Sequence, residues 1–293
     1  WDRAETAQQK SLAYTRERKR GKSNDNKNGE TDLILKHADI RRSLMNMKSI
    51  IEGQRSLAFW LSQQVDVSLN HSNENIRKEA DEMVSLMTPV VKSFFSDMGM
   101  EITNEAIQVF GGYGYTRDQG IEQLYRYNRI TPIYEGTNSV QAIDLVFRKV
   151  LTNKTLEKFT SLVQNEIKNY NNNDELKRLS NILEEKIKIL LDFSNWLDVK
   201  LKNQKDDVSA ACNDFLKVLG YVALGFSWLK MTKVSYENSS KNKEFYEEKI
   251  NTAKYFFDKF LPRIDSHYHS AIAGSESLMK AKINWKWVYT KKI

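Results

Sequence analysis

The chain has 293 residues, of which 40% are hydrophobic, and it carries a net charge of +7 with a single cysteine. This hydrophobic content can build a packed core and excludes disorder of the chain as a whole, and the length suffices for two cores. One cysteine, Cys212, excludes an internal disulfide and fits a reducing, cytoplasmic compartment.

The positive charge is spread thinly along the chain. Residues 1–150 hold 21 basic and 20 acidic side chains, and the remainder holds 24 and 18. Such interspersed charge is typical of a solvated surface and argues against a nucleic-acid-binding stripe. No apolar run reaches the roughly 18 residues of a membrane span. The chain begins at Trp1 without an initiator methionine, so we expect the C-terminal part of a longer polypeptide.

The composition favours helices throughout. Only 12 glycines and 3 prolines occur, and the alternating pattern of strands is absent. Apolar residues at helical spacing predict helices over 1–20, 39–70, 74–87, 88–110, 174–199, 207–236, 244–261 and 263–282. We therefore expect an all-α protein, with a four-helix-type bundle over residues 1–150 and a second α-helical domain over residues 151–293. Trp285 and Trp287 are expected to pack against that second domain.

Two features mark helix ends in the first half. Gly21 ends the first predicted helix after a basic run, Arg16 to Arg20, which suits either a solvated helix end or a phosphate. Thr88 and Pro89 resemble an N-cap followed by proline at the first helical position, which predicts a new helix.

The helical pattern breaks between residues 107 and 149. Gly111, Gly112 and Gly114 lie close together, without the spacing of a dinucleotide-binding fingerprint. They fit a helix C-cap, or a place where backbone N–H groups approach a flat or anionic ligand. A further helix is expected from Asn138 or Ser139, with an apolar face of Val140, Ile143, Val146, Phe147 and Val150 turned inward.

Glu135 lies at the centre of this irregular stretch, between Ile133-Tyr134 and Gly136-Thr137. A carboxylate on a turn with apolar flanks is poorly solvated, which raises its pKa and makes it a better proton acceptor. From these residues alone, a capping or surface glutamate and a catalytic base are equally good interpretations.

Several blocks in one order resemble the C-terminal signature of the acyl-CoA dehydrogenases. They are Gln108-Val-Phe-Gly111-Gly112-Tyr-Gly114-Tyr-Thr, Glu122-Gln-Leu-Tyr-Arg126, Arg129-Ile-Thr-Pro-Ile-Tyr-Glu135-Gly136-Thr137-Asn and Gln141-Ala-Ile-Asp-Leu. Upstream, Leu12-Ala-Tyr14, Glu17-Arg18 and residues 36–42 fit as well. Leu261-Pro262 and residues 271–279 are similar to an extra helical domain in one subgroup. That subgroup includes the 3-methylmercaptopropionyl-CoA dehydrogenases of dimethylsulfoniopropionate breakdown.

The resemblance implies an oxidoreductase that converts an acyl-CoA thioester to the trans-2-enoyl-CoA. Glu135 would take the α-proton, and a hydride would pass to FAD. The Glu135 N–H would stabilise the enolate, and Gly136 would keep the substrate side of the turn open. FAD would be bound by Arg18 near the pyrophosphate, Gln108 and Gly112 near the adenosine across a subunit interface, and Thr137 beside the base. The implied partners are electron-transferring flavoprotein and a second copy of the chain, as a dimer or tetramer.

Four positions depart from the family pattern, namely Arg20, Gly21, Tyr127 and Phe147. The N-terminal helical domain and the β-domain of the family have no counterpart in the chain, so this part alone is expected to be inactive and to hold FAD weakly. Two other functions are compatible with the sequence. One is a DNA-binding relative, which the charge of +7 allows, and the other is a catalytically silent scaffold.

Overall fold

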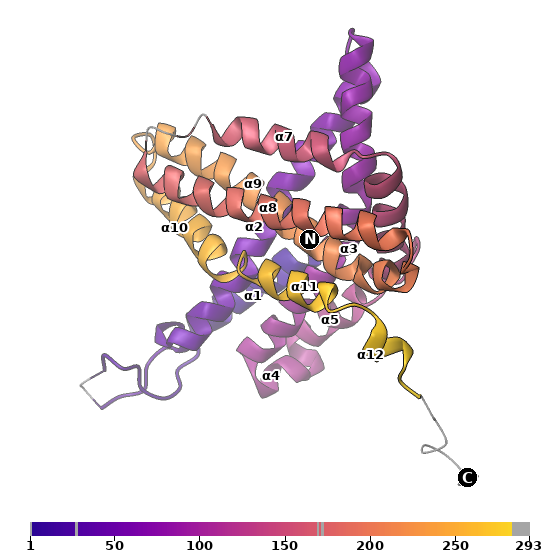
Figure 1. The fold of residues 1–293 in the computed structure, drawn as a ribbon. Helices are drawn as coiled ribbons and strands as arrows, with labels where there is room; N and C mark the ends of the chain where they lie inside the picture. Colours follow the sequence, from indigo (N-terminus) through magenta and orange to yellow (C-terminus); the bar gives the residue numbers. More distant parts are fainter. Residues whose placement is uncertain (1, 27–28, 169, 171–172, 283–293) are drawn as a thin grey trace.

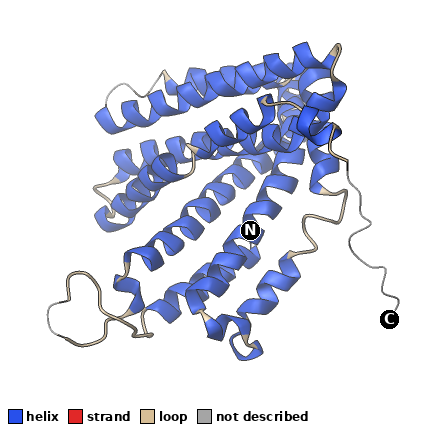
Figure 2. Ribbon diagram, turned by 60° about the horizontal axis from the view of Figure 1, so that its bottom comes forward, coloured by secondary structure: helices blue, strands red, loops and turns tan. Residues whose placement is uncertain are grey.

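The computed structural model describes residues 2–26, 29–168, 170 and 173–282. Within these residues the chain is all helical, as predicted, and contains no strand (Figure 2). The order of elements is shown in Figure 1: α1 Asp2–Thr15, η1 Ile34–Lys36, α2 Ala38–Asn70, α3 Glu74–Phe110, α4 Gly112–Tyr115, η2 Arg117–Gln119, α5 Ile121–Asn128, α6 Asn138–Asp144, η3 Leu145–Thr152, α7 Leu156–Ile167, α8 Asp174–Leu201, α9 Lys205–Asn238, α10 Lys243–Lys259, α11 Arg263–Ile272 and α12 Glu276–Met279.

The first half is organised around two long helices, α2 and α3, which pack against each other as a hairpin. The tip of this hairpin extends beyond the rest of the molecule (Figure 1). Asn73 begins α3 as its N-cap, because its Oδ1 accepts the N–H groups of Asn75 and Ile76. The predicted helix over 39–70 is confirmed, and Leu44, Met47 and Ile51 are buried along it.

The prediction of a new helix at Pro89 is wrong, because α3 runs from Glu74 to Phe110 without a break. Thr88 does not act as an N-cap, and its hydroxyl donates back to the Val84 carbonyl at 2.7 Å. A proline inside a helix removes one main-chain hydrogen bond and its ring clashes with the carbonyl four residues earlier, which together cost about 3 kcal/mol. Leu86, Met87 and Val90 around it are completely buried, so tertiary packing offsets this cost.

The second half surrounds α9, which packs against α2, α3, α6, α8, α10 and α11. Every residue from Val218 to Leu229 is buried. Two glycines allow close approach of helices at this contact: an added Cβ at Gly220 would stand 2.5 Å from the Phe94 ring, and one at Gly53 would stand 2.9 Å from Trp228 Nε1. The buried apolar residues of both halves therefore form one continuous cluster.

Two further predictions need correction. In the helix after Asn138, Ala142 and Leu145 are buried in place of Val140 and Ile143, which are exposed. The winding then becomes π-helical over Leu145–Thr152, and Val146 and Val150 are buried as predicted. The helix predicted over 263–282 is interrupted at Gly274, whose φ of +78° ends α11. Trp285 and Trp287 lie outside the described residues.

None of the helices in the described ranges is both long and apolar enough to cross a bilayer.

Candidate functional site

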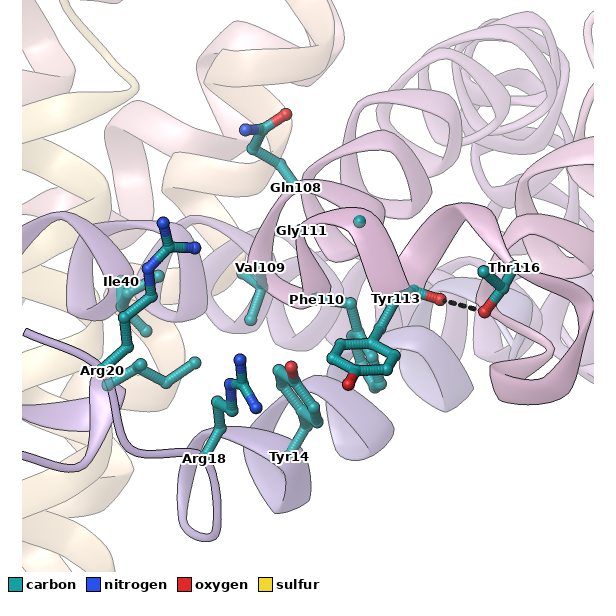
Figure 3. Close-up of a pocket in the computed structure, with 12 residues that line it drawn as sticks. Tyr14, Arg18, Arg20, Ile40, Gln108, Val109, Phe110, Gly111, Tyr113 and Thr116 are labelled. Atoms are coloured by element: carbon teal, nitrogen blue, oxygen red, sulfur yellow. Dashed lines mark hydrogen bonds between the residues drawn. The ribbon is translucent and has the colours of Figure 1, made fainter.

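A pocket of about 540 Å³ lies where the C-terminal end of α3 meets the end of α1 (Figure 3). It brings together Arg18, Gln108 and Gly112, three of the four residues predicted to bind FAD. The full lining consists of Tyr14, Arg18, Arg20, Ile34, Ile40, Gln108, Val109, Phe110, Gly111, Gly112, Tyr113 and Thr116. It includes two guanidinium groups and no carboxylate, so the pocket suits an anionic ligand such as a diphosphate.

The two arginines project from an extended segment and not, as predicted, from a helix that continues to residue 20. Helix α1 ends at Thr15. The Arg20 N–H donates to the Asp32 carbonyl, and the Ile34 N–H donates to the Arg18 carbonyl, each at 2.8 Å. Alternate residues of an extended segment point to the same side, so Arg18 and Arg20 both line the pocket. The helix prediction concealed this spacing, and Arg20 was missed as a site residue.

Aromatic rings form one wall of the pocket. The rings of Tyr14 and Phe110 are stacked, with centroids 4.2 Å apart. The Arg18 guanidinium lies over the Tyr113 ring, 5.5 Å from its centroid, and these side chains gather on one side of the pocket in Figure 3. Flat rings beside cations are suitable for a ligand that carries both a planar group and phosphates.

The three glycines of this region serve different purposes. Gly111 has a φ of +60° and forms the C-cap of α3, a conformation that favours glycine. An added Cβ at Gly114 would meet the Ile107 carbonyl oxygen at 2.6 Å, so Gly114 is required for packing. An added Cβ at Gly112 would meet no atom within 4 Å. Gly112 therefore leaves space at the pocket rim that the described chain itself does not use.

Glu135 lies on a tight turn between α5 and α6. The Tyr134 N–H donates to the Ile130 carbonyl at 3.1 Å, and Glu135 itself has a φ of +54°. Its side chain is exposed, as are Ile133 and Tyr134. The desolvation that we expected from these apolar flanks is therefore not provided by the described part of the chain.

Backbone donors are exposed at the same turn. The N–H groups of Glu135, Gly136 and Thr137 donate to no acceptor within the described ranges. Thr137, and not Asn138 or Ser139, is the N-cap of α6, because its Oγ1 accepts the Val140 N–H at 3.4 Å. The Thr137 hydroxyl keeps its own hydrogen for donation. The turn therefore presents a carboxylate together with several hydrogen-bond donors.

Lys92, on α3, holds this turn and was not predicted from the sequence. Its ammonium group donates to the Gly136 carbonyl at 2.6 Å and to Asn138 Oδ1 at 2.9 Å. Lys92 precedes Gln108 by 16 positions on the same helix, which corresponds to about 24 Å along the axis. The structure thus places the Glu135 turn far along α3 from the pocket lined by Arg18 and Arg20, which we call the arginine pocket.

Two family models match the chain. The model described as "Acyl-CoA dehydrogenase, C-terminal domain" matches residues 2–150, and the model described as "Acetyl-CoA dehydrogenase C-terminal like" matches residues 158–282.

Several known proteins are similar to most of this chain. The chain is 30% identical over 289 residues to the 3-methylmercaptopropionyl-CoA dehydrogenase of Ruegeria pomeroyi, covering 96% of this chain and 48% of that protein. It is 28% identical over 247 residues to a broad-specificity linear acyl-CoA dehydrogenase of Mycobacterium tuberculosis, covering 80% of this chain and 40% of that protein. The crystal structure of an acyl-CoA dehydrogenase from Bacillus anthracis, complexed with FAD, superposes with a TM-score of 0.72 at 20% identity, covering 94% and 47% of the two chains. The chain thus spans about half the length of these relatives or less.

Proposed function

The chain belongs to the acyl-CoA dehydrogenase family, and we propose that it serves as the C-terminal part of an FAD-dependent enzyme that oxidises acyl-CoA thioesters to trans-2-enoyl-CoA. The observation that carries this proposal is the Glu135 turn. It presents an exposed carboxylate and three N–H groups that donate to no acceptor among the described residues, on a backbone that is fixed by side chains from α3 and α6.

The chemistry of the chain's own residues follows from this arrangement. The Glu135 carboxylate takes the proton from the carbon next to the thioester carbonyl. The charge that develops on the thioester oxygen needs donors, which the Glu135 N–H supplies. Gly136, with a φ of +84°, carries no side chain that would obstruct the approaching thioester. The acceptor for the hydride that leaves the β-carbon would be supplied by FAD bound beside this turn.

The arginine pocket fits the diphosphate and adenosine of FAD. Arg18 and Arg20 face it without a neighbouring carboxylate in the lining, and Gln108 and the open rim at Gly112 offer polar contacts to a nucleoside. Because this pocket is about 24 Å from the Glu135 turn along α3, we propose that each flavin is shared between two copies of the chain. One copy would contribute Arg18, Gln108 and Gly112, and the other would contribute Thr137 and Glu135. A homo-oligomer follows from this proposal.

The identity of the acyl group is inferred from the names of two relatives. 3-Methylmercaptopropionyl-CoA is the substrate named for the Ruegeria pomeroyi relative, while the Mycobacterium tuberculosis relative is named as broad in specificity. We propose a short acyl-CoA, with 3-methylmercaptopropionyl-CoA as the first compound to test, and electron-transferring flavoprotein as the electron acceptor.

The test is flavin bleaching by acyl-CoA thioesters, carried out with the complete polypeptide that contains this chain. We expect Glu135→Gln to retain its flavin and to lose at least about 100-fold in bleaching rate, because a positioned base contributes that much or more. Glu79→Gln, an exposed glutamate on α3 away from the turn, is the matched control and should bleach normally. Normal bleaching by Glu135→Gln would refute the proposed base. A wild-type protein that binds FAD but bleaches with no acyl-CoA would instead support the silent scaffold.

The flavin pocket has its own test. Arg18→Gln should lower the affinity for FAD, whereas Lys19→Gln, at the residue between the two arginines that line the pocket, should leave it unchanged. Equal FAD affinities for both variants and the wild type would place the flavin elsewhere.

A further inference from the structure

We propose that Lys92 and Asn138 are positioning residues, which lock the backbone of the Glu135 turn and thereby set the direction of the Glu135 carboxylate. Together with Asp97 they form what we call the turn clamp. The inference rests on the proposed role of Glu135 as the base, and it concerns residues that do not themselves touch the substrate.

The turn needs such a lock because its conformation is unfavourable. Glu135 and Gly136 have successive positive φ values of +54° and +84°, and a residue with a Cβ rarely adopts the first of these. Both peptide carbonyls are held by side chains. Gln141 Nε2 donates to the Glu135 carbonyl at 3.0 Å, and Lys92 Nζ donates to the Gly136 carbonyl at 2.6 Å. Neither peptide can rotate without losing a hydrogen bond.

Asn138 connects the turn to the middle of α3. Its Oδ1 accepts from Lys92 Nζ at 2.9 Å. Its amide nitrogen lies 2.6 Å from Asp97 Oδ1, 2.9 Å from Ser96 Oγ and 3.2 Å from the Ser93 carbonyl. One side chain therefore bridges the lysine that holds the turn and a carboxylate on the next helical turn. This geometry also fixes the Asn138 amide orientation, because only its nitrogen can donate to Asp97.

Charge keeps the clamp together. Asp97 is half-buried; burial raises its pKa, while hydrogen bonding from Asn138 and the nearby Lys217 of α9 and Lys92 act in the opposite direction. Burial lowers the pKa of Lys92, and the carboxylates of Asp97 and Glu135 counteract it. Lys92 thus lies between the carboxylate that anchors the clamp and the proposed base. Lys217 of α9 also lowers the pKa of Asp97 through its nearby positive charge.

The clamp explains why polar residues occur in the part of α3 where Val90, Phe94 and Met98 are buried. Lys92, Ser93, Ser96 and Asp97 follow the i, i+4 spacing that places residues on one side of α3, and that side faces the turn. A merely structural set of hydrogen bonds would stabilise the fold equally wherever it occurred. A set that ends on the Gly136 carbonyl, next to Glu135, controls where the carboxylate points. Misplacement by about 1 Å can cost about 100-fold in rate.

The test compares Lys92→Met with Lys149→Met in the complete flavin-loaded polypeptide. Lys149 also donates to a side chain of α3, Ser85 Oγ at 2.7 Å, but it lies away from the turn. We expect Lys92→Met to lower kcat roughly 10- to 100-fold, with KM for the acyl-CoA and flavin content unchanged. The isotope effect of α-deuterated substrate should rise, because proton removal becomes the slow step. Lys149→Met should alter none of these. A kcat for Lys92→Met within about threefold of the Lys149→Met value would overturn the proposal.

A second readout does not depend on activity. Amide hydrogen exchange over residues 130–140 should accelerate in Lys92→Met and in Asn138→Ala, with a smaller additional effect in the double variant because the two residues act as one unit. Lys149→Met should exchange there like the wild type. If the wild type bleaches with no acyl-CoA, the proposed function fails, and this exchange measurement still decides the clamp. Unchanged exchange in both clamp variants would refute it.

Discussion

Trp228 Nε1 of α9 donates a hydrogen bond to the main-chain carbonyl of Ser49 in α2 across 2.9 Å. The same nitrogen would stand 2.9 Å from a Cβ added at Gly53, one turn further along α2. The indole therefore fits against a stretch of α2 that must lack a side chain. This contact joins the two halves of the sequence at the centre of their common core.

We predict that Gly53→Ala destabilises the protein, although alanine is favoured over glycine in a helix by about 1 kcal/mol. The added methyl group would collide with Trp228 and with Leu224, and overpacking of this kind costs about 1–3 kcal/mol. Urea unfolding followed by circular dichroism measures the change. Gln63→Ala, at an exposed position of the same helix, should stay within about 0.5 kcal/mol of the wild type. A Gly53→Ala protein at least as stable as the wild type would contradict this account of the contact.

Substitutions at Gly114 and Gly112 should affect different properties, namely thermal stability and flavin retention. Gly114→Ala is expected to lower the Tm, because its Cβ would lie 2.6 Å from the Ile107 carbonyl oxygen. Gly112→Ala meets nothing within 4 Å and should leave the Tm of the chain unchanged. If FAD approaches the pocket rim, Gly112→Ala should nevertheless reduce flavin retention. Thermal unfolding and flavin content after gel filtration separate the two effects. Full flavin retention by Gly112→Ala would show that the open rim is not used.

Acidification should release the segment around α12. Asp207 accepts hydrogen bonds from the hydroxyl and the N–H of Ser275, and these lower its pKa most. Lys200 lowers it further, and the pKa falls from 3.8 to about 2. A carboxyl with a depressed pKa stabilises the folded contact above its usual pKa and loses this contribution as the pH falls. We therefore expect hydrogen exchange over residues 274–279, corrected for intrinsic rates, to accelerate between about pH 4 and pH 2.

The controls for this pH effect lie within the same molecule. Asp207→Asn should show rapid exchange over residues 274–279 already at neutral pH, with little further change on acidification. The buried part of α9 from Val218 to Leu229 should stay protected across the window, which distinguishes local release from unfolding. Equal protection of residues 274–279 at pH 5 and pH 2 would contradict the role of Asp207.

Local patterns predicted the long helices, and non-local contacts decided what was missed. The spacing of Leu44, Met47 and Ile51 sufficed for α2, because a buried helix face leaves a periodic record in the sequence. The segment after Thr15 was wrongly predicted as helix, because its hydrogen-bonding partners at residues 32–34 lie many positions away. The predicted helix start at Pro89 rested on the local preference of proline for the first helical position. The surrounding core overrides this preference.

The site divides in the same way. The family resemblance brought attention to Glu135, Arg18, Gln108 and Gly112, and the last three line one pocket; the catalytic role of Glu135 stays a prediction. Lys92 binds the Gly136 carbonyl across 44 positions, and no sequence motif connects the two. Likewise, the extended backbone that aligns Arg20 with Arg18 becomes visible only when its pairing with residues 32–34 is known.

The burial of α9 from Val218 to Leu229 on all sides bears on how such a protein can evolve. The apolar faces of α2 and α3 that carry Gly53 and Phe94 are matched residue by residue to Trp228 and Gly220. Recombination between diverged relatives near residue 150 would keep the sequence of each half intact. The two sides of this shared surface would then no longer fit each other. We therefore expect that the second half cannot be exchanged alone between relatives without loss of stability. Its substitutions must be accepted together with those of α2 and α3, so the two halves are expected to share one line of descent.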